Sequence, residues 1–295
     1  MHAKVLWALI ASLAVTTGMA FQAFAEDKKP EEKPAETPAP KPVSVFADKN
    51  LESAVRKFIF AKRYNEEPIV EDDVRNLSTI QASGKKIKSL AGLEKCRSLA
   101  LLDINNNEIE DLTPIKDLKK LQSLDLGKNK IKDVAPLAGL TGLQYLILES
   151  NEVEDIAALK PLVALTTLNV AKNKLKSLEV VAAHKRLWSL YVNDNQITDL
   201  KPLKDLKWLS SLDLKNNQIA DITPLAGMTE LKYLFLQNNK VEDIGVLVDM
   251  ASKDADKRFA PFWRVFLKGN PLNDAARGAQ VEALEKSGGK VKLGE

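Results

Sequence analysis

Cysteine and histidine are almost missing from this sequence. Cys96 is the one cysteine among 295 residues, and only His2 and His184 are histidines. A single cysteine excludes an internal disulfide, so the fold must be held together by its core. There is also no cysteine–histidine cluster with metal-ligand spacing, no glycine-rich phosphate loop and no nucleophile motif. The sequence therefore predicts no catalytic residue, no metal site and no cofactor, and we expect a protein that is not an enzyme.

An excess of one charge is lacking as well. The 43 Lys and Arg residues nearly balance the 40 Asp and Glu residues, which leaves a formal net charge of +3. No basic run stands out along the chain. Nucleic-acid-binding proteins usually carry a strongly basic region, so we expect no nucleic-acid partner.

A hydrophobic run long enough for a membrane helix is also absent. The short apolar run near the start follows Lys4 and precedes Ala23-Phe24-Ala25, which is the pattern of a secretory signal peptide with its cleavage site. We expect cleavage after Ala25 and no stable membrane span afterwards. The protein is thus predicted to be exported, and to be periplasmic or secreted. Residues 26–44, which are mostly Pro, Glu, Lys and Ala, are predicted to form a disordered linker.

What the sequence does contain is a repeat. The stretch "LDLGKNKIKDVAPL" begins at Leu124, and "LDLKNNQIADITPL" begins at Leu212, 88 residues or four times 22 further on. In a 22-residue frame, Leu-like residues occupy places one, four and six, and Asn occupies place nine. Each copy is too small to cover its apolar side, so the copies must stack. The frame starts at Leu77, Leu99, Leu121, Leu143, Leu165, Leu187, Leu209, Leu231 and, after an insertion at residues 252–261, Phe262.

The spacing within each copy has a physical interpretation. The Leu-x-Leu alternation places side chains on one face of a short strand. The Asn follows where the chain turns, and its amide can bond backbone groups that would otherwise be buried without partners. We interpret this column as a structural ladder made of Asn107, Asn129, Asn151, Asn173, Asn195, Asn217, Asn239 and Asn270.

This pattern resembles the 22-residue leucine-rich repeat found in bacterial internalins. The resemblance implies an α/β solenoid, a horseshoe with a parallel β-sheet on its concave face and 3₁₀ turns on its convex face. It also implies a helical N-terminal cap and a C-terminal helix cap, because a stack needs covered ends. The predicted divisions are a signal peptide (1–25), the linker (26–44), the helical N-terminal cap (45–76), leucine-rich repeats with nine strands (77–272) and the C-terminal cap (273–295).

Side chains at places two, three and five of each copy are expected to point outward, so they do not have to fill the core. Exposed aromatic groups on a sheet usually indicate a partner, although bulky residues also favour strands for their own packing. The N-terminal strands carry acidic residues there instead. The predicted partner-binding residues are Tyr145, Ile147, Trp188, Tyr191, Tyr233, Phe235, Trp263, Phe266, Asp103, Asp125 and Asp213.

These residues favour a non-enzymatic protein that binds another protein through the concave surface. Two alternatives remain open. Aromatic rows also stack on sugar rings, so a carbohydrate or cell-wall binder would use the same face. Regulation of an exported enzyme is the other alternative, suggested by the phosphatase regulatory subunits that share this repeat class.

Overall fold

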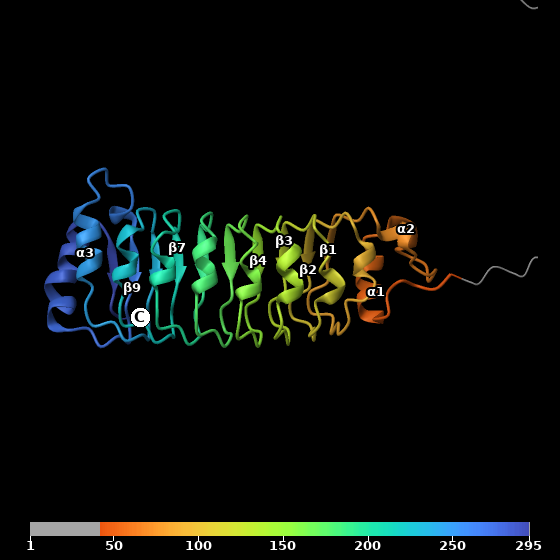
Figure 1. Ribbon diagram of the computed structural model, residues 1–295, viewed down its shortest axis with the longest axis horizontal. Coiled ribbons are helices and arrows are strands. Elements are labelled where there is room, and N and C mark those ends of the chain that lie inside the picture. The colour runs from red at the N-terminus through yellow and green to blue at the C-terminus, as the bar shows by residue number, and fades with distance from the viewer. Residues whose placement is uncertain (1–41, 295) are drawn as a thin grey trace, which may run out of the picture. The chain divides into compact units, whose positions relative to one another are not determined.

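The structure is a computed structural model that describes residues 42–294. These residues form one compact unit, a stack of repeats (Figure 1). The expected signal peptide and nearly all of the expected linker lie outside the described residues.

Ten short parallel strands make one sheet, and each strand pairs with the next one along the chain. The register follows the repeat, so that Leu124 pairs with Leu146 across a 22-residue step. The tenth strand belongs to the C-terminal cap. The strands are β1 (Thr79–Gln81), β2 (Leu101–Asp103), β3 (Ser123–Asp125), β4 (Tyr145–Ile147), β5 (Thr167–Asn169), β6 (Ser189–Tyr191), β7 (Ser211–Asp213), β8 (Tyr233–Phe235), β9 (Arg264–Phe266) and β10 (Lys290–Lys292).

Short helices lie on the side of the stack opposite the sheet. Most are 3₁₀ turns, and α3 (Gly245–Ser252) takes their place in the eighth repeat. The 3₁₀ turns on this side are η2 (Leu93–Lys95), η3 (Thr113–Ile115), η4 (Ala135–Gly139), η5 (Ala157–Leu159), η6 (Glu179–Ala183), η7 (Lys201–Leu203) and η8 (Thr223–Gly227). Two further 3₁₀ turns lie elsewhere: η1 (Phe60–Lys62) belongs to the N-terminal cap, and η9 (Ala260–Phe262) leads directly into β9. The predicted α/β solenoid, with a parallel sheet on one side and 3₁₀ turns on the other, is confirmed.

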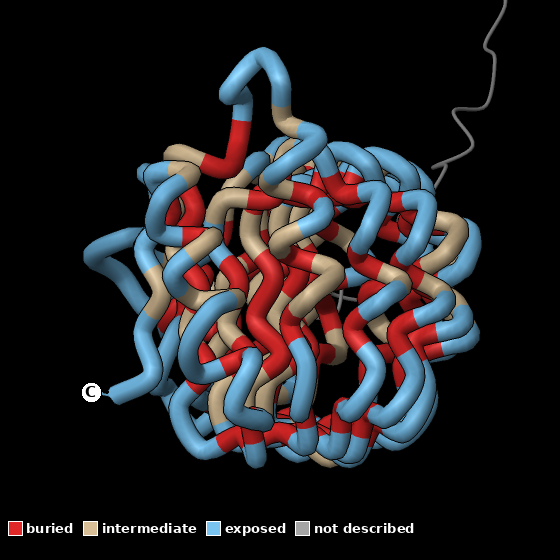
Figure 2. The backbone as a smooth tube through the Cα atoms, turned by 90° about the vertical axis from the view of Figure 1, so that its left-hand side faces the viewer, coloured by how far each residue is buried: buried red, intermediate tan, exposed pale blue. Residues whose placement is uncertain are grey.

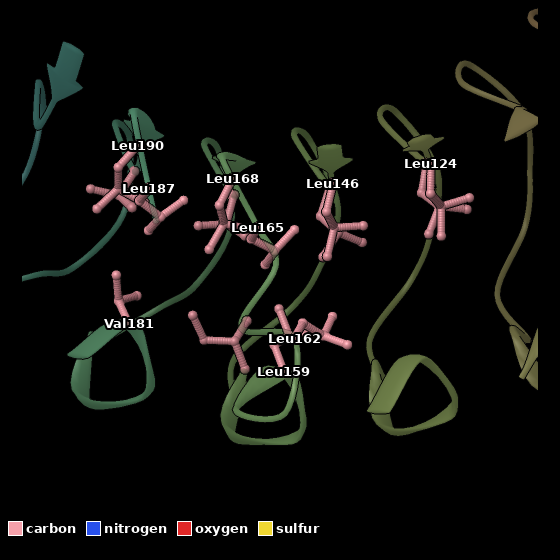
Figure 3. Close-up of a cluster of buried hydrophobic side chains, with 14 of the residues drawn as sticks. Leu124, Leu146, Leu159, Leu162, Leu165, Leu168, Val181, Leu187 and Leu190 are labelled. Carbon is pink, nitrogen blue, oxygen red and sulfur yellow. The ribbon is translucent and has the colours of Figure 1, made fainter. Parts of the chain in front are cut away.

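The core lies between the sheet and the turns (Figures 2 and 3). The middle residue of each strand points inward, as Leu146 and Leu168 do, and meets side chains from the turns such as Leu159 and Leu162. All four are fully buried. Because each repeat covers the apolar side of the next, the hydrophobic stabilisation grows with the number of copies.

The asparagine column connects these layers. The Asn173 side-chain oxygen accepts the Val153 amide at 3.0 Å, and its Nδ2 donates to the carbonyl oxygens of Leu148 (2.9 Å), Val170 (3.1 Å) and Ala171 (3.0 Å). Equivalent bonds recur at the other predicted ladder positions, for example 20 and 25 residues back from Asn195. One side chain therefore satisfies an amide and several carbonyls where no strand or helix provides partners.

Replacing Asn173 by Ala should leave the Val153 amide and the Leu148 carbonyl without partners and should cost about 1–3 kcal/mol of unfolding free energy. Lys85 stands at the same place in the first repeat and is exposed, so Lys85→Ala should have little effect. Urea unfolding midpoints of both variants make the measurement. Equal midpoints would contradict a structural role for the column.

The corner before each ladder residue is left-handed. Place eight has φ between 53° and 57° in seven consecutive copies, a region that side chains other than glycine seldom adopt. The sequence analysis did not identify this feature, although Gly84 and Gly269 at the same place carry a signal for it. The left-handed residues are Asn106, Lys128, Ser150, Lys172, Asp194, Asn216 and Asn238.

Helices cover both ends. At the N-terminal end, α1 (Lys49–Arg56) begins after Asp48, whose Oδ1 accepts the amides of Asn50 (2.8 Å) and Leu51 (3.1 Å). Its Oδ2 accepts the amides of Lys88 (2.8 Å) and Ser89 (3.1 Å), so one carboxylate caps the helix and attaches it to the first repeat. Partial burial opposes ionisation, but the four amides lower the pKa of Asp48.

Three further helical segments complete the ends. The C-terminal cap ends in β10, which extends the sheet beyond β9. The segments are α2 (Glu71–Val74) at the N-terminal end and, at the other end, the π-helical turn η10 (Ala276–Gln280) followed by α4 (Val281–Lys286).

His184 is a buried histidine in the core layer of the turns. It is fully buried, its Nε2 lies 3.0 Å from the Leu159 carbonyl oxygen, and its Nδ1 has no hydrogen-bond partner within the described residues. Burial lowers the pKa of His184 from its ordinary value, so the ring is neutral at pH 7. Leu occupies this place in neighbouring copies, as Leu162 and Leu206 show.

Acidification should therefore destabilise the protein through this ring. With a lowered folded pKa, the unfolded chain takes up the proton first as pH falls below about 6.5, and stability is lost from there downward. His184→Leu removes this pH-dependent contribution, so the decrease in the urea midpoint between pH 7.5 and pH 5 should be smaller in the variant. An unchanged pH dependence in the variant would show that His184 contributes none of it.

Candidate binding face

The outward side chains of places three and five form a continuous surface, which we call the sheet face. Tyr145 and Tyr233 stand at place three and are 51% and 49% exposed. The other place-three residues are all less exposed, including the long side chain of Arg264, which is partly buried. Four strand intervals separate the two tyrosines, which corresponds to about 19 Å at the usual strand spacing.

A row of predicted residues crosses the C-terminal half of this face at place five. The register aligns Tyr191 with Asp213, Asp213 with Phe235, and Phe235 with Phe266. The rings of Phe235 and Phe266 are stacked, with centroids 4.7 Å apart and planes at 9°. Lys215 Nζ lies 5.4 Å from the Phe235 ring centroid. Each of the three aromatic residues is partly exposed, so the row is both ordered and accessible.

Asp213 is a partial exception among the predicted contact residues. It stands on the sheet face, but its neighbours leave it only 8% exposed. Its Oδ1 accepts the Lys215 amide at 3.1 Å, and the Lys215 Nζ lies 3.1 Å from Oδ2. Burial raises the pKa of Asp213 despite these contacts. The carboxylate therefore orders the row, and little of it is accessible to a partner.

The prediction that Trp263 lies on the exposed face is wrong. Trp263 is 1% exposed, packs against Phe259 with ring centroids 5.2 Å apart, and donates its indole N–H to the Leu231 carbonyl. In this repeat the insertion brings the chain into β9 through η9 rather than through the usual loop. Phe262 stands at place one, which is buried in all the copies from β2 to β8, but here it is 55% exposed. Phe262 and Trp263 have therefore exchanged the outward and inward positions.

The N-terminal half of the sheet face is acidic. Asp103 and Asp125 are neighbours on β2 and β3, and both accept from the side-chain Nδ2 of Asn105, at 2.7 Å and 3.4 Å. Burial raises the pKa of Asp125, and the charges of Asp103 and Glu149 raise it further. A shallow hollow at this point is lined by Asn105, Asp125, Gly127, Lys128, Ile147, Glu149 and Asn169.

Removing the charge of Asp125 should stabilise the fold at neutral pH. A raised acid pKa means that its favourable contribution is present below the unfolded value and is lost as pH rises through the folded value. Asp125→Asn should therefore raise the urea midpoint at pH 7 and change it little at about pH 3.

Asp111→Asn is the matched control. The Thr113 hydrogen bonds lower the pKa of Asp111, so loss of its charge should decrease stability at pH 7. The same sign of change in both variants at pH 7 would contradict the assignment.

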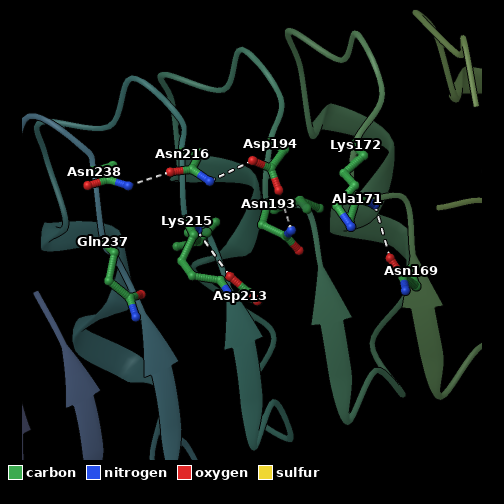
Figure 4. A network of polar contacts seen from close by, with 12 residues as sticks. Asn169, Ala171, Lys172, Asn193, Asp194, Asp213, Lys215, Asn216, Gln237 and Asn238 are labelled. Atoms are coloured by element: carbon green, nitrogen blue, oxygen red, sulfur yellow. Dashed lines mark hydrogen bonds and ion pairs between the residues drawn. The ribbon is translucent and has the colours of Figure 1, made fainter. Parts of the chain in front are cut away.

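A second polar row follows the strand ends (Figure 4). Asn238 donates to Asn216 at 2.6 Å, and Asn216 donates to Asp194 at 2.5 Å. These residues occupy the left-handed place, so the corner geometry aligns them from one repeat to the next. Farther toward the N-terminus, Lys172 forms an ion pair with Glu149 at 2.8 Å. These contacts stiffen the rim of the sheet face.

Several exposed side chains escaped the sequence analysis. Trp208, the residue just before the seventh repeat begins, is 58% exposed. Trp188, the second residue of the sixth repeat, was predicted and is 51% exposed. Glu149 completes the acidic group at place seven. A comparison of the copies at places seven and twenty-two would have identified both residues. Phe262 gave no such signal, because its register is the first place of a copy, which is buried in the copies from β2 to β8.

Among residues 42–294, no three His, Cys, Asp or Glu side chains are grouped as a metal site would require. Within the same part of the chain, each helix is too short or too polar to cross a bilayer.

Comparisons with known proteins match this geometry. Residues 119–161, 185–227 and 207–249 match a family model described as leucine-rich repeats in two copies. The solved structure of internalin C2 from Listeria monocytogenes is 30% identical with a TM-score of 0.67, and the match covers 70% of this chain and 91% of that one. The chain belongs to the internalin-like leucine-rich repeat family.

More distant structures share the fold of this internalin-like chain. A leucine-rich repeat protein of Leptospira interrogans is 20% identical with a TM-score of 0.61, over 76% of this chain and 69% of that one. The leucine-rich repeat ectodomain of a receptor kinase from Arabidopsis thaliana is 22% identical with a TM-score of 0.54, over 65% and 23%. No match was found among curated protein sequences. Internalin-like repeats typically bind proteins and are generally non-catalytic, which is the class of function that the family supports.

Proposed function

We propose that this internalin-like chain is an exported, non-enzymatic protein that recognises a protein partner through the sheet face. The observation that carries the proposal is the pair of half-exposed tyrosines, Tyr145 and Tyr233, on a rigid sheet whose core they do not fill. Aromatic side chains in such positions are enriched at protein interfaces. Export rests on the signal pattern of the first 25 residues.

The remainder of the face supports a polypeptide partner. The stacked Phe235 and Phe266 present an apolar surface that is already ordered, so binding would cost little side-chain entropy. Asp103 and Asp125 lie on the same face and would attract basic side chains of the partner. A partner that spans both regions would contact β2 through β9, a distance of about 34 Å, which suits a protein surface.

The test is capture of partners by the purified protein and by a Tyr145→Ala/Tyr233→Ala variant. The variant should unfold close to the native midpoint, because both rings are half-exposed. Its affinity for a captured protein should fall roughly thirtyfold or more, as expected when interface anchors worth about 2 kcal/mol are lost.

Tyr64→Ala is the matched control, since Tyr64 is 90% exposed but lies in the N-terminal cap. It should leave capture unchanged. Leu234→Ala removes a fully buried side chain from β8 and should instead cost about 2–5 kcal/mol of stability. The proposal fails if the double-tyrosine variant captures the same proteins with the same affinity as the native chain.

A further inference from the structure

A second surface lies along the edge at which the strands begin. We call it the strand-start edge and define it as the four residues from two places before to one place after each repeat start. The backbone ladder holds it in line: the Trp188 amide donates to Thr166 at 2.8 Å, Ser210 to Trp188 at 2.9 Å, and Lys232 to Ser210 at 2.8 Å. Side chains on this edge therefore recur at every strand along the stack.

The edge is strongly basic although the protein is nearly neutral. Glu230 is its one acidic residue among the described repeats, and it is paired with Arg258 of the insertion. The insertion itself projects as a loop between α3 and β9 (Figures 1 and 2). The eight basic residues of the edge are Arg75, Arg97, Lys119, Lys120, Lys185, Arg186, Lys207 and Lys232.

Arg75 and Arg97 form ion pairs with Asp72 and Glu71, but most of the remaining positive charge is not neutralised by the protein. Within the described residues, Lys119, Lys120, Arg186 and Lys207 are exposed and form no ion pair. The Lys185 ammonium lies 3.7 Å from Asp205, but both groups are more than half exposed, so that pair is weak. The basic residues were missed in the sequence because they occur singly or in adjacent pairs, with about one repeat or more between occurrences, and never form a longer run.

Aromatic rings accompany the charges in the C-terminal half of the edge. Trp188, Trp208 and Phe262 are 51%, 58% and 55% exposed. The Lys232 Nζ lies 5.8 Å from the Phe262 ring centroid, so cation and ring are adjacent. Trp188 and Trp208 form neither an aromatic pair nor a cation–ring contact among residues 42–294, so their exposed rings are available to a ligand.

We propose that the strand-start edge binds a linear anionic polysaccharide, one whose sugar units carry carboxylate or sulfate groups. Open aromatic faces pack on the apolar faces of sugar rings, and exposed ammonium and guanidinium groups attract the anions. From β2 to β9 the edge is about 34 Å long and narrow, which fits an extended chain better than a flat membrane. The proposal rests on the export part of the proposed function, because an exported protein meets such polymers, but not on the sheet face.

The experiment titrates the purified protein with polygalacturonate and, in separate arms, with unsubstituted dextran, single-stranded oligothymidylate and phosphatidylglycerol vesicles. The charge variant is Lys120→Glu/Arg186→Glu/Lys207→Glu. Its matched control, Lys116→Glu/Lys160→Glu/Lys204→Glu, changes the net charge equally at exposed lysines that follow the 3₁₀ turns. Trp188→Ala/Trp208→Ala tests the rings, and Tyr145→Ala/Tyr233→Ala separates the edge from the sheet face.

Polygalacturonate should bind with an affinity that decreases as salt increases, and dextran should not bind. The edge charge variant should weaken binding about tenfold, as expected for several exposed charge contacts, and the control less than twofold. The tryptophan variant should weaken binding without changing the salt dependence. The double-tyrosine variant should bind polygalacturonate normally even where it has lost a protein partner.

Any one of the following results would overturn the inference: no binding of polygalacturonate, equal losses in the edge and control charge variants, or tighter binding of oligothymidylate or vesicles than of polygalacturonate. Loss of polygalacturonate binding in the double-tyrosine variant would place the polymer on the sheet face and would also overturn it. Failure of protein capture alone would count against the proposed function and leave the edge intact.

Discussion

The ladder of asparagine amides is the interaction on which the rest of the structure depends. A 22-residue coil with three-residue strands leaves many amides and carbonyls at its corners without strand or helix partners. Asn173 satisfies one amide and three carbonyls at such a corner. Because an unpaired buried polar group costs more than a typical hydrogen bond returns, each corner satisfied in this way favours stacking.

Because the ladder satisfies the backbone polar groups at the corners, the outward side chains of the strands are not needed for that purpose. Each strand contributes one inward residue, such as Leu146, to the core, and its two outward residues can vary. Variation is nonetheless limited by neighbours across the sheet. Asp213 is covered between Tyr191 and Phe235, whereas Tyr145 stands beside smaller residues and stays half-exposed. Exposure on this surface is therefore a property of adjacent repeats and not of single positions.

The period of the sequence was enough to predict the solenoid, the parallel sheet, the turns and the ladder, because each depends on residue type at a fixed place. The exposure of individual side chains was predicted less well from the sequence. Trp263 has the register of an outward residue but is buried, since the insertion changes the path into β9. The left-handed corner and the basic edge were missed for the opposite reason: the pattern is regular, but it appears only when the same place is compared across copies.

Two surfaces of unlike chemistry thus share one rigid scaffold. The sheet face is acidic toward its N-terminal end and aromatic toward the other, while the strand-start edge is basic. In a stack each repeat contacts only its neighbours, so coupling between sites must pass through local contacts. Ser210 and Tyr233 are directly linked by a backbone hydrogen bond of 3.0 Å, which places edge and face one residue apart. Occupants of the two surfaces would therefore influence each other mainly through direct contact, by charge or steric overlap.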